Sequence, residues 1–134
     1  MTTRAAPLST SDGDAACLLD VTALQAALAR FAAERDWERF HSPKNLAMAL
    51  AAEVGELLEL FQWQTEAASS ELARTPGSAR AVRDELADVL LYLVRLADVL
   101  GVDLDEACRT KIAANARKYP VERARGRADK YDAI

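Results

Sequence analysis

The sequence predicts an all-α protein whose helices form a four-helix bundle. Ala and Leu are abundant among the 134 residues while β-branched residues are sparse, a balance that favours helices over strands. Only 5 Gly and 4 Pro are present, which leaves long uninterrupted stretches. In four of these stretches, apolar residues recur every three or four positions, the period of an amphipathic helix. A chain of this length is expected to fold as one domain.

The first helix is expected to follow a polar leader. Residues 1–18 are small and polar, so we expect a disordered leader there. Asp20 is placed to cap a helix that runs to about Trp37, because apolar residues such as Leu28 and Phe31 recur at helical spacing.

The second helix is expected from Pro43 to about Trp63. The HSP stretch at 41–43 breaks the preceding helix, and Ser42 is a suitable N-cap. Proline suits the first helical position because its missing N–H has no intrahelical partner there.

A connection over residues 64–78, with room for a helical turn, leads to the third helix. It closes with a Pro-Gly pair, after which Ser78 is expected to cap a helix over residues 79–100. This helix should stop at Gly101, which suits the left-handed conformation at a helix end.

The fourth helix is expected to begin after Asp103, a cap that has Glu106 three residues later. It should end before Pro120, which cannot continue a helix. Residues 19–120 are thus predicted to form the helical domain, and residues 121–134 a basic, irregular tail.

Bulk properties exclude several classes of protein. The net charge of −4 argues against non-specific binding to nucleic acid over the whole surface. No stretch approaches the roughly 18 to 20 apolar residues of a membrane span. Cys17 and Cys108 form no disulfide framework, and the N-terminal residues lack a secretory apolar segment. We therefore expect a cytoplasmic protein with reduced thiols, no membrane association and no stable binding to nucleic acid.

Two pairs of acidic residues interrupt otherwise apolar helix faces. Glu53 and Glu56 lie in the stretch EVGE of the second helix, and Glu85 and Asp88 lie in ELAD of the third. Each pair is spaced i, i+3, so its side chains project from one face of their helix. None of the four has Lys or Arg three or four positions away. That absence argues against the simplest alternative, a solvated face stabilised by ion pairs.

The two acid pairs would meet if these helices are antiparallel neighbours. Both pairs lie 7 and 10 residues from the helix ends at the connection, roughly 10 to 15 Å along the axes. Close carboxylates repel by about 4 kcal/mol per pair, so either some are protonated or a multivalent cation lies among them. Hard oxygen ligands suit Mg²⁺, or Mn²⁺, better than Zn²⁺. A di-iron site would need Glu-x-x-His motifs, which the only histidine, His41, does not supply.

Other unusual residues suit a phosphorylated ligand with a flat ring. The candidates for contact with a base are Trp37, His41, Trp63 and Tyr92. The candidates for contact with phosphate share one stripe of the fourth helix: Lys111, Asn115 and Lys118. Ordinary alternatives are core packing for Trp63 and Tyr92, a capping role for His41, and a solvated tail for the basic residues after Pro120.

The chain resembles the all-α nucleoside triphosphate pyrophosphohydrolases, the MazG-like family, and most of all its dCTP pyrophosphatase branch. Three stretches carry the resemblance: FAAERDWERFHSPKNLAMALAAEVGELLELFQW, DELADVLLYLVRLADVLGVDL, and NARKYPVERARG followed by KY. They span nearly everything from about residue 22 to 131. The resemblance implies Mg²⁺-dependent hydrolysis of a nucleoside triphosphate to monophosphate and pyrophosphate by a helical bundle.

The resemblance also implies roles for the residues already singled out. The metal ligands would be Glu53, Glu56, Glu85 and Asp88, and either Glu53 or Glu56 would orient or deprotonate the attacking water. The four ring candidates would contact the base, and the three polar candidates would contact phosphate, joined by Tyr119 or Arg123. Members of the family assemble as dimers or tetramers with sites between subunits, so the fourth helix is expected to serve a neighbouring copy.

One departure from the family pattern is Ala113, at a position that often carries an acid. It affects the finer arrangement around phosphate or metal rather than the four-acid core. The expected substrate is dCTP or a modified pyrimidine relative, in nucleotide-pool housecleaning, with dUTP or a broader set as the alternative. A non-catalytic regulator would bind nucleotide or metal without turnover. A purely structural oligomerisation bundle would keep its stability and ligand responses after Glu53→Gln.

Overall fold

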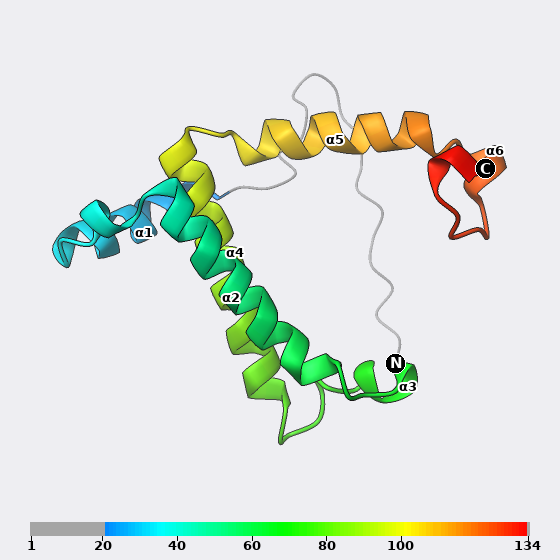
Figure 1. The fold of residues 1–134 in the computed structure, drawn as a ribbon, viewed down its shortest axis with the longest axis horizontal. Coiled ribbons are helices and arrows are strands. Elements are labelled where there is room, and N and C mark those ends of the chain that lie inside the picture. The colour runs from blue at the N-terminus through cyan, green and yellow to red at the C-terminus, as the bar shows by residue number, and fades with distance from the viewer. Residues whose placement is uncertain (1–20, 134) are drawn as a thin grey trace, which may run out of the picture.

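The computed structural model describes residues 21–133, and over that range its regular structure is helical (Figure 1). Four long helices carry the fold: α1 (Thr22–Glu34), α2 (Pro43–Phe61), α4 (Ala79–Leu100) and α5 (Leu104–Lys118). Short helical turns connect or follow them: η1 (Glu38–Phe40), α3 (Glu66–Ser69), α6 (Val121–Ala124) and η2 (Tyr131–Ala133). The predicted all-α class is confirmed. Within the described residues, no helix is both long and apolar enough to cross a membrane.

Several helix boundaries lie where the sequence predicted them, because local interactions determine them. The Ser42 hydroxyl accepts a hydrogen bond from the backbone N–H of Asn45 at 3.2 Å, and Pro43 takes the first position of α2. The Asp103 carboxylate accepts from the backbone N–H of Glu106 at 3.0 Å. Gly101 ends α4 with a φ of 68°, a conformation that costs glycine little.

Two predicted boundaries were wrong. α1 ends at Glu34 and not near Trp37, because Asp36 adopts a positive φ of 53° and the Trp37 N–H bonds back to the Ala32 carbonyl at 2.9 Å. The Ser78 side chain does not cap α4, since its hydroxyl donates to the Leu72 carbonyl at 2.7 Å.

The tail was also predicted incorrectly as irregular. It forms α6 and η2, and Tyr131 packs edge-on against Tyr119 with ring centroids 6.2 Å apart. The predicted leader, the Asp20 cap and Cys17 lie outside the described residues.

α2 and α4 form the centre of the fold. They pack side by side along their length, α1 packs against α4, and α5 leaves the pair at Gly101 and runs away from it (Figure 1). Few side chains are buried by this arrangement: Val21, Ala32, Leu46, Val82, Val94, Arg95 and Ala97. Among them, Leu46 and Val94 are the largest that are fully enclosed.

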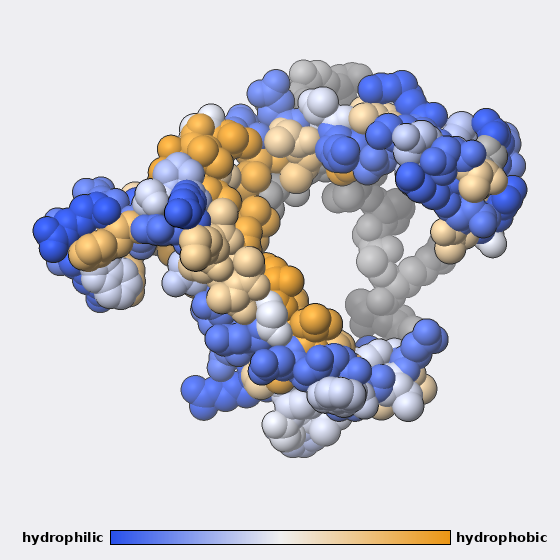
Figure 2. Space-filling view, in the orientation of Figure 1, coloured by the Kyte–Doolittle hydropathy of each residue, from blue (hydrophilic) through white to orange (hydrophobic). Residues whose placement is uncertain are grey.

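The α2–α4 pair leaves an apolar face uncovered. On α4, Leu86, Leu90 and Leu93 are 52%, 41% and 41% exposed, and they follow the 3–4 spacing of one helix face. On α2, Val54 and Leu58 are 47% and 58% exposed. Apolar side chains gather along the α2–α4 pair where it is turned toward α5 (Figure 2). An exposed group of apolar side chains of this kind is typical of a protein–protein contact. We call these five residues the apolar face.

Candidate functional site

Packing of α2 against α4 brings three of the four predicted metal ligands together. Glu53, Glu56 and Glu85 each place one carboxylate oxygen so that these oxygens lie within 4.8 Å of one another. The i, i+3 spacing on α2 sets two of them on one face, and the antiparallel neighbour supplies the third. Arg80 of α4 instead pairs with Asp84, at 3.6 Å. We call these three residues the acid cluster.

The electrostatics of the acid cluster are those of carboxylates without compensation. Desolvation, followed by the negative charges of Glu56 and Asp88, raises the pKa of Glu53 above its ordinary value. Desolvation and the charges of Glu56, Asp88 and the remaining nearby acids likewise raise the pKa of Glu85. Asp88, half-buried one turn along α4, therefore belongs to the same electrostatic group, although its oxygens lie outside the tight trio.

One atom of the cluster lacks a partner among residues 21–133. Oε2 of Glu85 is buried and meets no hydrogen-bond donor from that part of the chain. A buried oxygen of this kind is unfavourable unless a donor or a cation satisfies it. Clustered carboxylate oxygens with an unsatisfied buried member fit a hard divalent cation, which would supply the missing positive charge.

A small cavity lies beside Asp88 and collects three of the four predicted base contacts. Its volume is about 170 Å³, and its lining residues are Leu28, Phe31, Trp37, His41, Asp88, Leu91, Tyr92 and Arg95. The cavity thus lies between α1, the connection from α1 to α2, and the acid-bearing face of α4. We call it the ring pocket.

The side chains that form the wall of the ring pocket contact one another. Trp37 lies edge-on between Phe31 and His41, with centroid distances of 5.7 Å and 6.5 Å. The Arg35 guanidinium covers the Phe31 ring at 3.5 Å. Arg95 donates from Nε to Nδ1 of His41 at 3.2 Å. These contacts restrain the aromatic side chains before any ligand arrives.

Sequence reasoning missed Arg95, Leu28, Phe31 and Leu91 as lining residues. A usable signal for Arg95 was present, because it lies seven positions after Asp88 and three after Tyr92 and so shares their face of α4. It is also the only charge within the apolar stretch LLYLVRLA, residues 90–97.

Trp63, the fourth predicted base contact, does not join the ring pocket. It follows the end of α2 and is 86% exposed. It lies ten residues beyond Glu53 whereas His41 lies twelve before, so the two flank the acid cluster from opposite ends of α2.

The predicted phosphate contacts also stand apart from the acid cluster in this chain. Lys111, Asn115 and Lys118 are exposed on α5, and Ala113 is exposed among them. The Lys118 ammonium lies 5.1 Å from the centroid of the Tyr131 ring. α5 itself projects away from the α2–α4 pair (Figure 1).

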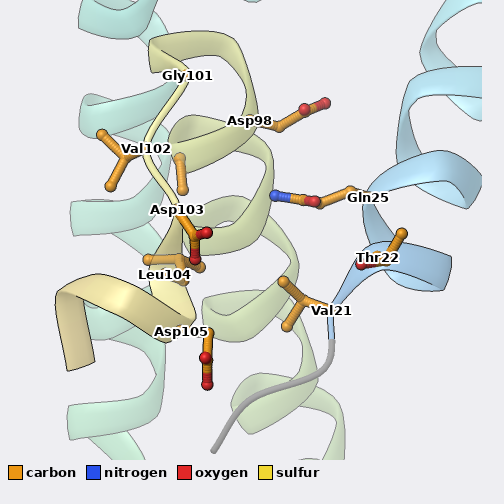
Figure 3. A pocket seen from close by; sticks show the side chains of 10 residues that line it. Val21, Thr22, Gln25, Asp98, Gly101, Val102, Asp103, Leu104 and Asp105 are labelled. Atoms are coloured by element: carbon orange, nitrogen blue, oxygen red, sulfur yellow. The ribbon is translucent and has the colours of Figure 1, made fainter. Parts of the chain in front are cut away.

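A larger cavity than the ring pocket, of about 420 Å³, lies elsewhere, where the α4–α5 turn meets the start of α1 (Figure 3). Its three acids are already engaged. Asp98 pairs with Arg95 at 3.1 Å, Asp105 pairs with Arg109 at 2.9 Å, and Asp103 caps α5. We therefore interpret the three acids as residues that stabilise the α4–α5 turn.

Comparison with known proteins agrees with the geometry. The chain is 52% identical over 103 residues to dCTP pyrophosphatase 1 of Rattus norvegicus and 50% identical over 103 residues to that of Homo sapiens. Each match covers 77% of this chain and 61% of the relative, so the chain spans about three fifths of the length of these relatives. A solved structure, a pyrophosphatase from Archaeoglobus fulgidus DSM 4304, is similar with a TM-score of 0.68 and 40% identity. That similarity covers 73% of this chain and 90% of the archaeal one.

The MazG-like family matches residues 48–134, the part of the chain that begins within α2 and includes the whole acid cluster. The resemblance found in the sequence is thereby confirmed, and the protein belongs to the MazG-like family.

Proposed function

We propose that this protein is a nucleoside triphosphate pyrophosphohydrolase that converts dCTP, or a modified dCTP, to the monophosphate and pyrophosphate in the cytoplasm. The observation that carries the proposal is the acid cluster, with its unsatisfied Glu85 oxygen, beside a pocket lined by aromatic rings. The names of the relatives, dCTP pyrophosphatase 1 and a pyrophosphatase, support the reaction and, for the former, the base.

Mg²⁺, with Mn²⁺ as a substitute, is the proposed metal, and when bound it offsets triphosphate charge and lowers the pKa of a water molecule. The proposed ligands of the metal are Glu53, Glu56, Glu85 and Asp88. The net reaction adds water across the bond between the α- and β-phosphates. The hydroxyl joins one phosphorus, and the proton reaches the oxygen released from the other. Either Glu53 or Glu56 is the proposed base that orients this water and accepts its proton.

The other candidate residues hold the two ends of the substrate. Trp37, His41 and Tyr92 restrain the base in the ring pocket, and Trp63 is a further proposed contact from the opposite side. Lys111, Asn115 and Lys118 are the proposed partners of the phosphate oxygens, where lysine stabilises charge that develops on the leaving pyrophosphate.

The separation between the acid cluster and the proposed phosphate contacts on α5 leads us to infer a homo-oligomer, either a dimer or a tetramer. One protomer alone leaves the apolar face uncovered and keeps α5 away from its own acid cluster. A second copy that packs on the apolar face would cover it and bring another α5 to the site, completing each site from two chains.

Incubation with dCTP, dUTP, dTTP, dATP and dGTP, with and without Mg²⁺, tests the proposal by separation of the products. We expect dCMP and pyrophosphate from dCTP, only when Mg²⁺ is present. Glu53→Gln should remove this turnover, whereas Glu59→Gln, a matched change on the same helix outside the acid cluster, should retain it. Intact triphosphate across the whole panel would defeat the proposal.

A further inference from the structure

Arg95 lines the ring pocket and makes polar contacts with two side chains there. This charged residue is only 8% exposed. Its Nε donates to Nδ1 of His41 at 3.2 Å, and its Nη1 donates to Oδ2 of Asp98 at 3.1 Å. The carboxylate of Asp98 thus holds the guanidinium from one side, and the guanidinium is directed at one atom of the imidazole.

This contact determines where His41 carries its hydrogen. A guanidinium has only donors, so Nδ1 of His41 must accept and therefore carries no hydrogen. In a neutral imidazole the single hydrogen then lies on Nε2. Burial, and next the positive charge of Arg95, lower the pKa of His41, while Glu38 acts weakly in the opposite sense. The ring is accordingly neutral at pH 7.

The orientation of the ring is restrained as well. Trp37 lies against His41 at an interplanar angle of 61°, and Trp37 is itself packed on Phe31. With Nδ1 engaged by Arg95, the Nε2–H of His41 is left as the free donor of the ring. Within residues 21–133 that donor meets no acceptor, and His41 lines the cavity of about 170 Å³.

We propose that Arg95 is a positioning residue that fixes His41 as the Nε2–H tautomer, so that the ring pocket offers a hydrogen-bond donor to the base. Cytosine matches such a donor when the donor faces N3, because N3 of cytosine is an acceptor. Uracil and thymine carry a hydrogen on N3, which opposes the same donor and would leave buried polar groups unpaired. The inference rests on the proposed function only in that a base must occupy this pocket.

The tautomer is measured directly by nitrogen NMR of the full chain labelled with ¹⁵N-histidine. The sequence contains one histidine, so the ring gives a single set of signals. We expect the Nε2–H tautomer at pH 7. The Nδ1–H tautomer, or an imidazolium, would overturn the proposal. This measurement needs neither substrate nor turnover, so its failure is distinguishable from failure of the proposed function.

Arg95→Met tests the consequence for the base. Removal of the donor should give a mixture of imidazole tautomers. It should also reduce the preference for dCMP over dUMP, measured by calorimetry with Mg²⁺ present, about tenfold, as expected for one buried hydrogen bond. Arg80→Met removes the same charge from an exposed position on the same helix and should keep the preference of the unmodified protein.

Arg95→Lys provides the second variant should Arg95→Met fail to fold. Lysine keeps the charge but lacks the planar guanidinium that joins His41 to Asp98. The Nε2–H tautomer and the preference for dCMP over dUMP should therefore both decrease, by less than in Arg95→Met. An unchanged tautomer and an unchanged dCMP preference in whichever variant folds would refute the positioning role.

Discussion

The α2–α4 pair and α5 carry the two halves of the candidate site, and they are placed by different means. On the pair, Glu53, Glu56 and Glu85 meet because two helices of one chain pack along their length. α5 carries exposed cations and packs extensively against none of the other described helices. The proposed metal centre is therefore built within one protomer. The proposed phosphate contacts would depend on the proposed assembly.

Glu85→Gln should produce the largest effect, because it removes one ligand from the half that the protomer builds alone. We expect the rate of dCMP formation to fall by about 10³-fold, the scale seen when one preorganised electrostatic contact is lost. A variant that keeps more than a tenth of the rate would show that the acid cluster is not the reaction centre. Glu59→Gln is the control, as above.

Leu90→Glu should disrupt the apolar face and so separate the acid cluster of one copy from the α5 of another. A buried charge at the centre of a contact between copies is expected to shift the protein to monomers, measured by sedimentation. Hydrolysis should fall roughly 100-fold if each site takes its α5 from another copy. Val121→Glu introduces the same charge at an exposed position on α6 and serves as the control. Monomers with full activity would contradict the shared site.

Lys111→Met should weaken hydrolysis about tenfold to 100-fold, since it removes one charge-assisted contact with phosphate. Subunit exchange then sharpens the comparison. When Lys111→Met and Glu85→Gln proteins are mixed in equal amounts and exchange subunits, roughly a quarter of full activity should return. About half of the dimers are then mixed, and each mixed dimer contains one intact site of two if α5 serves its neighbour. No recovery on mixing would show that α5 serves the acids of its own chain.

The smallest expected effect concerns stability without metal. The folded-state pKa values of Glu53 and Glu85 lie above the ordinary value of 4.5, so the folded protein binds more protons than the unfolded chain just above that pH. Their contribution to stability is therefore present below pH 4.5 and is lost as the pH rises through the folded values. Glu85→Gln should remove part of this loss and raise the metal-free Tm at pH 7 by a few degrees relative to the unmodified protein.

Thermal unfolding from pH 4.5 to 7, with and without Mg²⁺, measures this effect. Mg²⁺ should raise the Tm of the unmodified protein more than that of Glu85→Gln, because ligand binding stabilises only the form that binds it. A metal-free Glu85→Gln protein that is less stable than the unmodified one at pH 7 would contradict the account.

Much of the fold could be predicted because it depends on neighbours in the sequence. The limits of α4 at residues 79–100, the Ser42 and Asp103 caps and the left-handed Gly101 follow from local chemistry. The acids could be identified for the same reason, since their i, i+3 spacing and missing cations are visible in one dimension.

Contacts between distant residues could not be predicted in this way. The Arg95–His41 hydrogen bond joins positions 54 apart, and α5 projects from the pair although its pattern suits a bundle helix. Trp63 shares helical spacing with the acids, yet α2 ends at Phe61 and leaves this ring exposed. Periodicity identifies a face but not the partner that covers it.

Titration with Mn²⁺, followed by electron paramagnetic resonance, tests the central claim most directly, because it counts bound ions without requiring turnover. The unmodified protein should bind Mn²⁺, Mg²⁺ should displace it, and Glu85→Gln should weaken the affinity at least about tenfold through loss of one charged ligand. Equal Mn²⁺ affinity in both proteins, or no binding to the unmodified protein, would mean that the carboxylates of α2 and α4 do not form a metal centre.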